Sequence, residues 1–165
     1  MLILGLDPGS LHTGYGLVDK RGTAVTAVDW GRISSPRRLP LPRRLADLAA
    51  SLGELLDRRR PDLAVLETPF AGMNPRSLIV LAEARGALLA GLAGRGLEVV
   101  EYTPAEVKSA VTGNGRADKG QVARMVQLLL RLDGEALAED TTDALAVAIC
   151  CAQRMRLDNL AKSLC

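Results

Sequence analysis

The sequence is poor in aromatic residues, cysteine and histidine. Aromatic side chains make up 2% of the 165 residues, and the only phenylalanine is Phe70. The three cysteines include the adjacent pair Cys150 and Cys151, and they match neither a disulfide framework nor a zinc-ligand spacing. This pattern predicts a reducing, cytoplasmic location. His12 is the only histidine, and we interpret it as a turn residue rather than a catalytic base.

The sequence also has no long uninterrupted hydrophobic run. The most apolar window, residues 78–92, contains Glu83 and Arg85 and is too short to span a membrane. The N-terminus lacks the basic region of a signal peptide and reaches an acid at Asp7. We therefore expect neither a membrane span nor a signal peptide. A net charge of +2 permits a nucleic-acid partner without arguing for one.

The length and the apolar patterning predict a single α/β domain over residues 1–165. A short tail follows from about residue 158, for which disorder is an open alternative. Short gaps join the first three strands, so they form antiparallel hairpins, and βα units follow them. The prediction is a mixed five-stranded sheet with helices on both faces. The expected strands are 2–6, 13–18, 24–33, 63–66 and 97–102, and the expected helices are 41–60, 75–93, 104–112, 118–132 and 139–158.

Two of the predicted strands end on an acid. The apolar run 2–6 shows no alternation, which suits a strand buried on both faces, and it stops at Asp7 before a Pro-Gly turn. The buried run 63–66 stops in the same way at Glu67. If these strands are parallel neighbours, both carboxylates emerge at one edge of the sheet, where open α/β sheets bind ligands. The alternative for Asp7 is that it only opens the turn.

Two further acids lie at the start of the last predicted helix. Asp140 and Asp143 are three residues apart and therefore share one helix face. Asp140 could simply complement the helix dipole, because acids stabilise a first turn. Asp143 precedes an apolar stretch that should be buried, and a buried acid without a partner is costly. Four carboxylates would suit Mg²⁺ or Mn²⁺, and two such ions can support phosphodiester cleavage.

Five segments between Met1 and about Ala152 carry a family resemblance: LGLDPGSLHTGYGLV, AVLETPF, LAEARG, EYTPAEVKSAVTGNGRADKGQV and DTTDALAVAI. In these segments the chain resembles the RuvC family of bacterial Holliday junction resolvases. The resemblance implies an RNase H-like fold, a homodimer, and symmetric nicking of four-way junctions that depends on Mg²⁺ or Mn²⁺, with two ions at each site and a preference for TT-containing sequences. It also implies the branch-migration proteins RuvA and RuvB as partners. The family's catalytic acids fall on Asp7, Glu67, Asp140 and Asp143.

The same resemblance implies a set of DNA contacts. Phe70 falls where the family carries an aromatic that stacks on junction bases, and the alternative is that it anchors the core. Lys108 and Lys119 match family lysines near the scissile phosphate. Arg116 lies between them beside a glycine-rich connector. The alternative for the basic residues is a solvated helix surface.

Three rival functions remain open. The spacing from Asp7 to Thr13 and Gly14 also resembles the first phosphate loop of the actin and sugar-kinase ATPases, but that fold needs two such domains. Another RNase H-like nuclease, acting on hybrids or on ends, is a closer alternative. A non-catalytic junction-binding subunit would need the basic and aromatic residues but would have no use for four acids.

The predicted helix 75–93 is the best candidate for a dimer interface. Its apolar residues cover more than one face, which is wider than the stripe of a surface helix, and small residues between them would allow close approach of a second helix. The alternative is a helix buried within the monomer. The apolar residues are Leu78, Ile79, Leu81, Ala82, Leu88, Leu89 and Leu92.

Overall fold

The computed structural model describes residues 1–69, 74–132 and 134–163, and it confirms the predicted order of strands and helices. The strands are β1 (Leu2–Asp7), β2 (His12–Arg21), β3 (Ala24–Ser34), β4 (Leu63–Glu67) and β5 (Glu98–Tyr102). The helices are α1 (Leu41–Arg59), α2 (Pro75–Ala93), α3 (Pro104–Thr112), α4 (Lys119–Leu130) and α5 (Glu139–Ser163).

A few boundaries differ from the prediction. Strand β2 is longer than expected because its pairing with β3 continues along the whole hairpin, from His12 opposite Ser34 onward. His12 therefore begins a strand rather than forming a turn, and its exposed ring lies 3.1 Å from the Ser34 hydroxyl. Helix α4 stops early because Arg131 adopts a left-handed conformation, with φ of 56°. Helix α5 continues to Ser163, past the predicted end near residue 158.

The sheet brings two acid-ended strands together. Its strand order is β3-β2-β1-β4-β5, with antiparallel pairing among β1 to β3 and parallel pairing of β4 with both β1 and β5. The predicted mixed sheet is therefore confirmed. Leu6 lies opposite Leu66 in the parallel β1–β4 pair, so the next residues, Asp7 and Glu67, end their strands at the same edge of the sheet.

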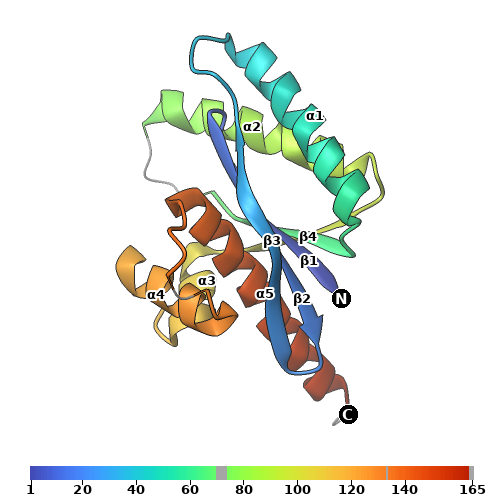
Figure 1. The fold of residues 1–165 in the computed structure, drawn as a ribbon, viewed down its shortest axis with the longest axis vertical. Coiled ribbons are helices and arrows are strands. Elements are labelled where there is room, and N and C mark those ends of the chain that lie inside the picture. The colour runs from blue at the N-terminus through green and yellow to red at the C-terminus, as the bar shows by residue number, and fades with distance from the viewer. Residues whose placement is uncertain (70–73, 133, 164–165) are drawn as a thin grey trace.

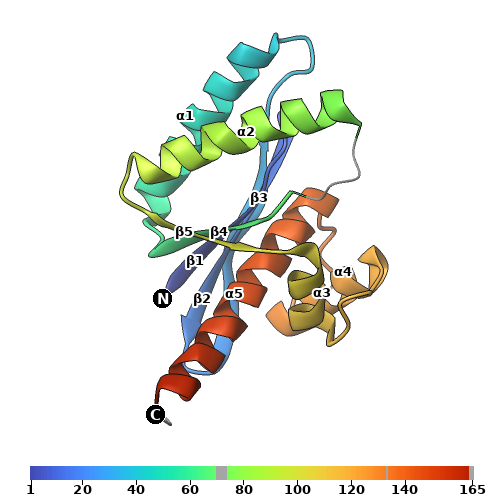
Figure 2. The same cartoon turned by 180° about the vertical axis from the view of Figure 1, so that it is seen from behind.

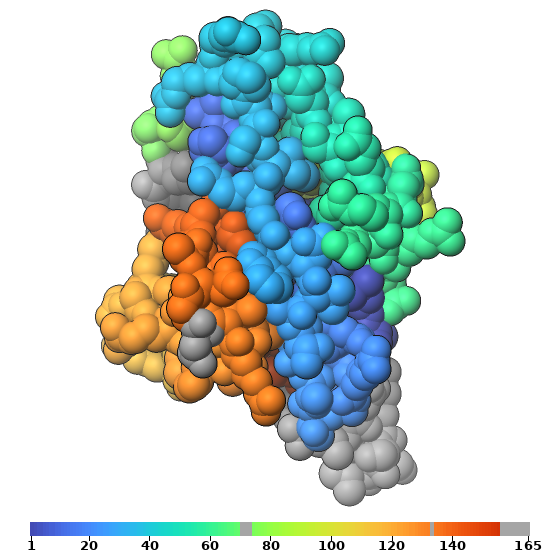
Figure 3. Space-filling model, in the orientation of Figure 1, coloured from blue at the N-terminus to red at the C-terminus, as the bar shows by residue number. Residues whose placement is uncertain are grey.

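Helices cover both faces of this sheet, as predicted. Helices α1 and α2 pack on one face, and α3, α4 and α5 pack on the other (Figures 1 and 2). The central strands supply side chains to both layers in alternation: Ile3 faces the α5 layer while Leu4 faces the α1–α2 layer. In Figure 3 the β2–β3 hairpin forms a strip of surface between α1 and the segment that leads into α5.

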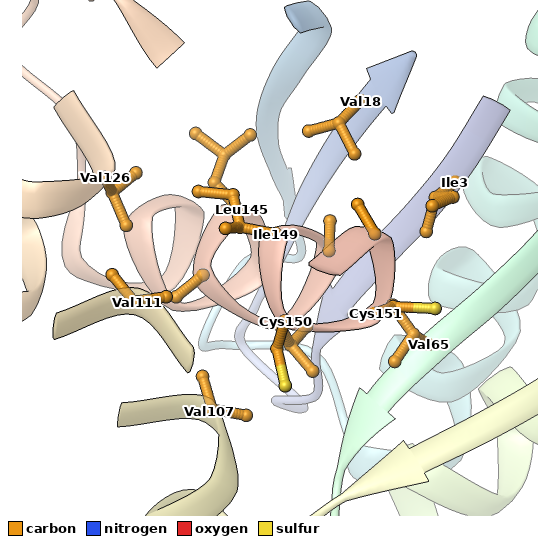
Figure 4. Close-up of a cluster of buried hydrophobic side chains, with 14 of the residues drawn as sticks. Ile3, Val18, Val65, Val107, Val111, Val126, Leu145, Ile149, Cys150 and Cys151 are labelled. Atoms are coloured by element: carbon orange, nitrogen blue, oxygen red, sulfur yellow. The ribbon is translucent and has the colours of Figure 1, made fainter. Parts of the chain in front are cut away.

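Helix α5 forms the centre of the second layer. Figure 4 shows side chains of β1, β2, β4, α3 and α4 gathered around it. Its residues from Ala144 to Ala152 are all buried, and Cys150 and Cys151 are fully buried, as expected of inert thiols. Among the described residues, no helix has the length and apolarity needed to cross a membrane.

Glycines in β1 and β2 let α5 lie directly on the sheet. A Cβ atom at Gly5 would lie 2.0 Å from the main-chain oxygen of Ala144, and one at Gly14 would lie 1.9 Å from that of Asp140. Real Cβ atoms essentially never come closer than 3.0 Å to such atoms. These two glycines therefore set how near the start of α5 can come to the ends of β1 and β2.

Candidate active site

A cavity of about 850 Å³ opens at the sheet edge where β1 and β4 end. Asp7 and Glu67 are the last residues of these two strands, and Asp140 and Asp143 lie near the start of α5. All four acids line the cavity. The structure thus gathers the four predicted acids from segments that are far apart in the sequence.

The surroundings of the cavity raise the pKa values of Asp7, Glu67 and Asp143. Burial, together with repulsion from Asp143, Glu67 and Asp140, raises the pKa of Asp7 from 3.8 to about 7. The pKa of Glu67 is also raised, first by burial and then by Asp143. Burial likewise raises the pKa of Asp143. A cation bound among these carboxylates would relieve both the desolvation and the repulsion.

Two of the predicted basic residues line the same cavity. Lys108 comes from α3 and Lys119 from α4. Their positive charges partly offset the burial that raises the pKa values of Glu67 and Asp143. The Lys119 ammonium pairs with Glu139 and lies 3.9 Å from a carboxylate oxygen of Asp143. The bond to Glu139 raises the pKa of Lys119. The cavity is therefore lined by both the four acids and two positively charged side chains.

The donor set fits a hard divalent cation, because oxygen ligands are what Mg²⁺ and Mn²⁺ prefer. Among the residues that the structure describes, however, no three acids are already grouped as a ligand set. The carboxylate of Asp140, in particular, is already occupied by other partners. One of its oxygens lies 2.9 Å from Nε of Arg32, and the other accepts from the Thr141 N–H at 2.9 Å. Arg32 and a cation would compete for the same carboxylate.

Arg116, a further predicted DNA contact, lies away from the cavity. Arg116 is exposed on the connector between α3 and α4, and it is not among the residues that line the cavity. Its N–H donates to the Asn114 side chain at 3.0 Å. Phe70 lies outside the described residues, so its stacking role stays a prediction.

Three further charged residues line this cavity and were not predicted as site residues: Arg32, Arg85 and Glu139. Arg85 had a signal, because it interrupts the most apolar window of the chain. Arg32 and Glu139 had none, because each pairs with a residue that only the fold brings near.

The model of one protein family matches residues 3–151, and its description is crossover junction endodeoxyribonuclease RuvC. The chain belongs to the RuvC family. The predicted RNase H-like fold is thereby confirmed, and membership of this nuclease family implies use of a divalent cation.

Relatives within the RuvC family match almost the whole chain. The RuvC of Alkalilimnicola ehrlichii is 49% identical over 148 residues, which cover 90% of this chain and 88% of the relative. The RuvC of Citrifermentans bemidjiense is 42% identical over 163 residues, covering 99% of both chains. The structure of Thermus thermophilus RuvC in complex with Holliday junction substrate superposes with a TM-score of 0.90, at 30% identity and 96% coverage of both chains.

Proposed function

We propose that this chain is an endodeoxyribonuclease that resolves four-way DNA junctions by paired symmetric nicks, in recombination and repair. One observation carries the proposal: four acids from β1, β4 and α5 line a single cavity together with two lysines. A set of buried acids alone would suit many metal enzymes, and the lysines add the positive charge that a DNA backbone needs. The RuvC relatives, one of them described with a Holliday junction, support the choice of substrate.

The metal ligands in this proposal are Asp7, Glu67, Asp140 and Asp143, with Mg²⁺ or Mn²⁺ as the cation and two ions in each site. Bound there, the ions would supply an activated water and stabilise the leaving oxygen of the phosphodiester. The protein itself orients the acids, since β1, β4 and the start of α5 hold them at one sheet edge. Asp140 must exchange its pairing with Arg32 for a ligand role.

The DNA-binding residues in this proposal are Lys108, Lys119, Arg116 and Phe70. Lys108 and Lys119 would contact the backbone near the scissile phosphate, because both line the cavity. Lys119 is exposed and pairs with Glu139. A DNA phosphate would replace the Glu139 carboxylate as the anion that pairs with the Lys119 ammonium. Arg116, on the α3–α4 connector, would contact an arm of the junction, and Phe70 would stack on a base.

The experiment compares a synthetic four-way junction with a plain duplex, in Mg²⁺ and in Mn²⁺. The wild type should cut the junction and spare the duplex. Changing any one acid to its amide should abolish cleavage and leave junction binding intact, because the DNA-binding residues remain. The variants are Asp7→Asn, Glu67→Gln, Asp140→Asn and Asp143→Asn, with Glu54→Gln on the exposed side of α1 as the matched control.

The possible results of this comparison distinguish the alternative functions. A variant that cleaves at the wild-type rate removes that residue from the ligand set. Equal cutting of duplex or hybrid would identify a general RNase H-like nuclease. Tight junction binding by the wild type without cutting in either metal would identify a non-catalytic junction-binding subunit, and the proposal would be wrong.

Paired nicks need two active sites, so we also propose a homodimer related by a twofold axis. Helix α2 supports this. It buries one side against α1 and the sheet, yet Ile79 on its outer side is 59% exposed. Ala82, Gly86 and Ala90 continue that exposed side at helical spacing, and a Cβ at Gly86 would meet no atom within 4 Å. Small residues along one side of a helix allow another helix to approach closely.

The dimer is tested with a charge on α2. Ile79→Glu should give a folded monomer by light scattering that makes single nicks only. Leu128→Glu is the matched control, because Leu128 on α4 is 62% exposed and should leave the dimer intact. A wild type that is monomeric both free and on a junction would contradict the symmetric mechanism. RuvA and RuvB as partners rest on the family alone, and a cytoplasmic location rests on the cysteine pattern of the sequence.

A further inference from the structure

Helix α2 carries a buried arginine. Arg85 is 8% exposed and lies on the side of α2 that packs against the sheet, next to Ala84 and one turn from Leu88. Burying a guanidinium group costs free energy unless its N–H groups are bonded. Its partners therefore indicate what the side chain does.

The guanidinium group of Arg85 contacts the ends of two strands. Its Nη1 donates to the main-chain oxygen of Glu67 at 2.9 Å, and its Nη2 lies 2.5 Å from a carboxylate oxygen of Glu101 on β5. The same side chain lines the cavity that holds the four acids. Arg85 thus connects α2 to the last residue of β4 and to β5.

Glu67 is the residue of β4 at which pairing with β1 has ended while pairing with β5 continues. The β1–β4 pairing ends at Leu6 and Leu66, whereas the chain beyond continues on the β5 side, where the Thr68 N–H donates to Tyr102. The Glu67 carbonyl and the Thr68 N–H belong to the same peptide unit, so Tyr102 holds one side of this unit and Arg85 holds the other. The two bonds together restrain the backbone at the end of β4, from which the Glu67 side chain projects.

We infer that Arg85 is a positioning residue for Glu67: its bond to the Glu67 carbonyl holds that side chain toward the other three acids. The inference rests on the proposed function, in which Glu67 is a metal ligand. Arg85 contacts the main chain of Glu67 and pairs with the carboxylate of Glu101, so it leaves the Glu67 carboxylate free to act as a ligand. Groups that orient metal ligands typically change metal affinity or activity by about 10–100-fold when they are removed.

Four variants test this role. Arg85→Met keeps most of the apolar volume and removes both donors. Arg85→Lys keeps the charge and one possible donor to the carbonyl. Glu101→Gln weakens the ion pair but leaves the Arg85 bond to Glu67. Arg95→Met is the matched control, because Arg95 is a half-exposed arginine just after α2 that pairs with Asp57 instead.

Three measurements are made on each full-length variant: single-turnover cleavage of a junction, junction binding without a divalent metal, and Mn²⁺ binding from the electron paramagnetic resonance signal of free Mn²⁺. We expect Arg85→Met to lose about 10–100-fold in cleavage and to bind Mn²⁺ more weakly, with junction binding little changed. Arg85→Lys should recover part of both losses, and Glu101→Gln and Arg95→Met should behave like the wild type.

Results that would overturn the inference about Arg85 differ from results that would count against the proposed function. Wild-type cleavage and Mn²⁺ binding in Arg85→Met would overturn the inference, as would an equal loss in Glu101→Gln, which would assign the effect to the ion pair. If thermal unfolding shows that Arg85→Met does not fold, Arg85→Lys decides. A partial loss of cleavage together with weaker Mn²⁺ binding and a normal melting curve supports the inference, whereas wild-type values of both, or loss of cleavage with unchanged Mn²⁺ binding, overturn it. A wild type that binds Mn²⁺ but does not cut junctions would count against the proposed function alone.

Discussion

Gly14→Ala is the substitution that most directly tests how the site is assembled. Gly14 lies opposite Asp7 in the β1–β2 pair, and its Cβ would lie 1.9 Å from the main-chain oxygen of Asp140. The neighbouring atom is backbone and cannot rotate away. The start of α5, which carries Asp140 and Asp143, must therefore move away from the sheet by about 1.5 Å to restore an ordinary contact of 3.4 Å.

The size of the effect follows from this displacement. Overpacking of this kind costs about 1–3 kcal/mol, against a gain of about 0.4–1 kcal/mol from a less flexible unfolded chain. The net loss should lower the melting temperature by several degrees, since about 1 kcal/mol corresponds to roughly 2–4 °C in a domain of this size. A misplacement of about 1 Å in a catalytic site can cost about 100-fold in rate. Cleavage should therefore fall far more than junction binding.

The assay is single-turnover junction cleavage beside thermal unfolding and a gel-shift measurement of binding. Gly91→Ala is the control, because its Cβ would meet only the far end of Leu52, at 3.2 Å, and alanine favours a helix by about 1 kcal/mol. It should cleave normally and melt at or above the wild-type temperature. A Gly14→Ala protein that melts and cleaves like the wild type would refute the close-contact argument.

Three further predictions follow from the site and the core. Because the pKa of Asp7 is raised to about 7 from 3.8, the folded protein keeps a proton there that the unfolded chain has lost. The stability of the metal-free protein should fall as pH rises from about 4 through 7, and Asp7→Asn should flatten this fall in the melting temperature. Lys108→Ala and Lys119→Ala should each slow cleavage and reduce the slope of log binding constant against log salt by about 1. Alanine at both Cys150 and Cys151 should lower the melting temperature but leave nicking unchanged under reducing conditions, and loss of activity in a folded double variant would contradict this.

Much of the site could be predicted because strand ends are local signals. A buried apolar run that stops on an acid and a turn places Asp7 and Glu67 without knowledge of the fold. The parallel pairing of β1 with β4 remained a condition of the prediction, because β2, β3 and α1 lie between these strands in the chain, and the structure supplies it. Asp143 was marked by the apolar stretch that follows it, and that stretch is indeed buried.

The remaining features depend on contacts between distant segments, which carry no local pattern. The pairing of Arg32 with Asp140 joins β3 to α5, and the bond from Arg85 to Glu67 joins α2 to β4. The close approach at Gly14 is of the same kind, because a glycine in a strand does not indicate which backbone lies above it. The end of helix α4 also differed from the prediction, because the left-handed conformation of a single residue, Arg131, ends the helix.

The position of α5 has a consequence for synthesis of the chain. Asp7 and Glu67 are made early, but the strands that carry them remain without their central cover until α5 has been made and docked on Gly5 and Gly14. A chain that has been translated only through α4 holds two of the four acids that line the cavity. The complete set of four therefore comes together only when α5 docks, in the same step that closes the hydrophobic core.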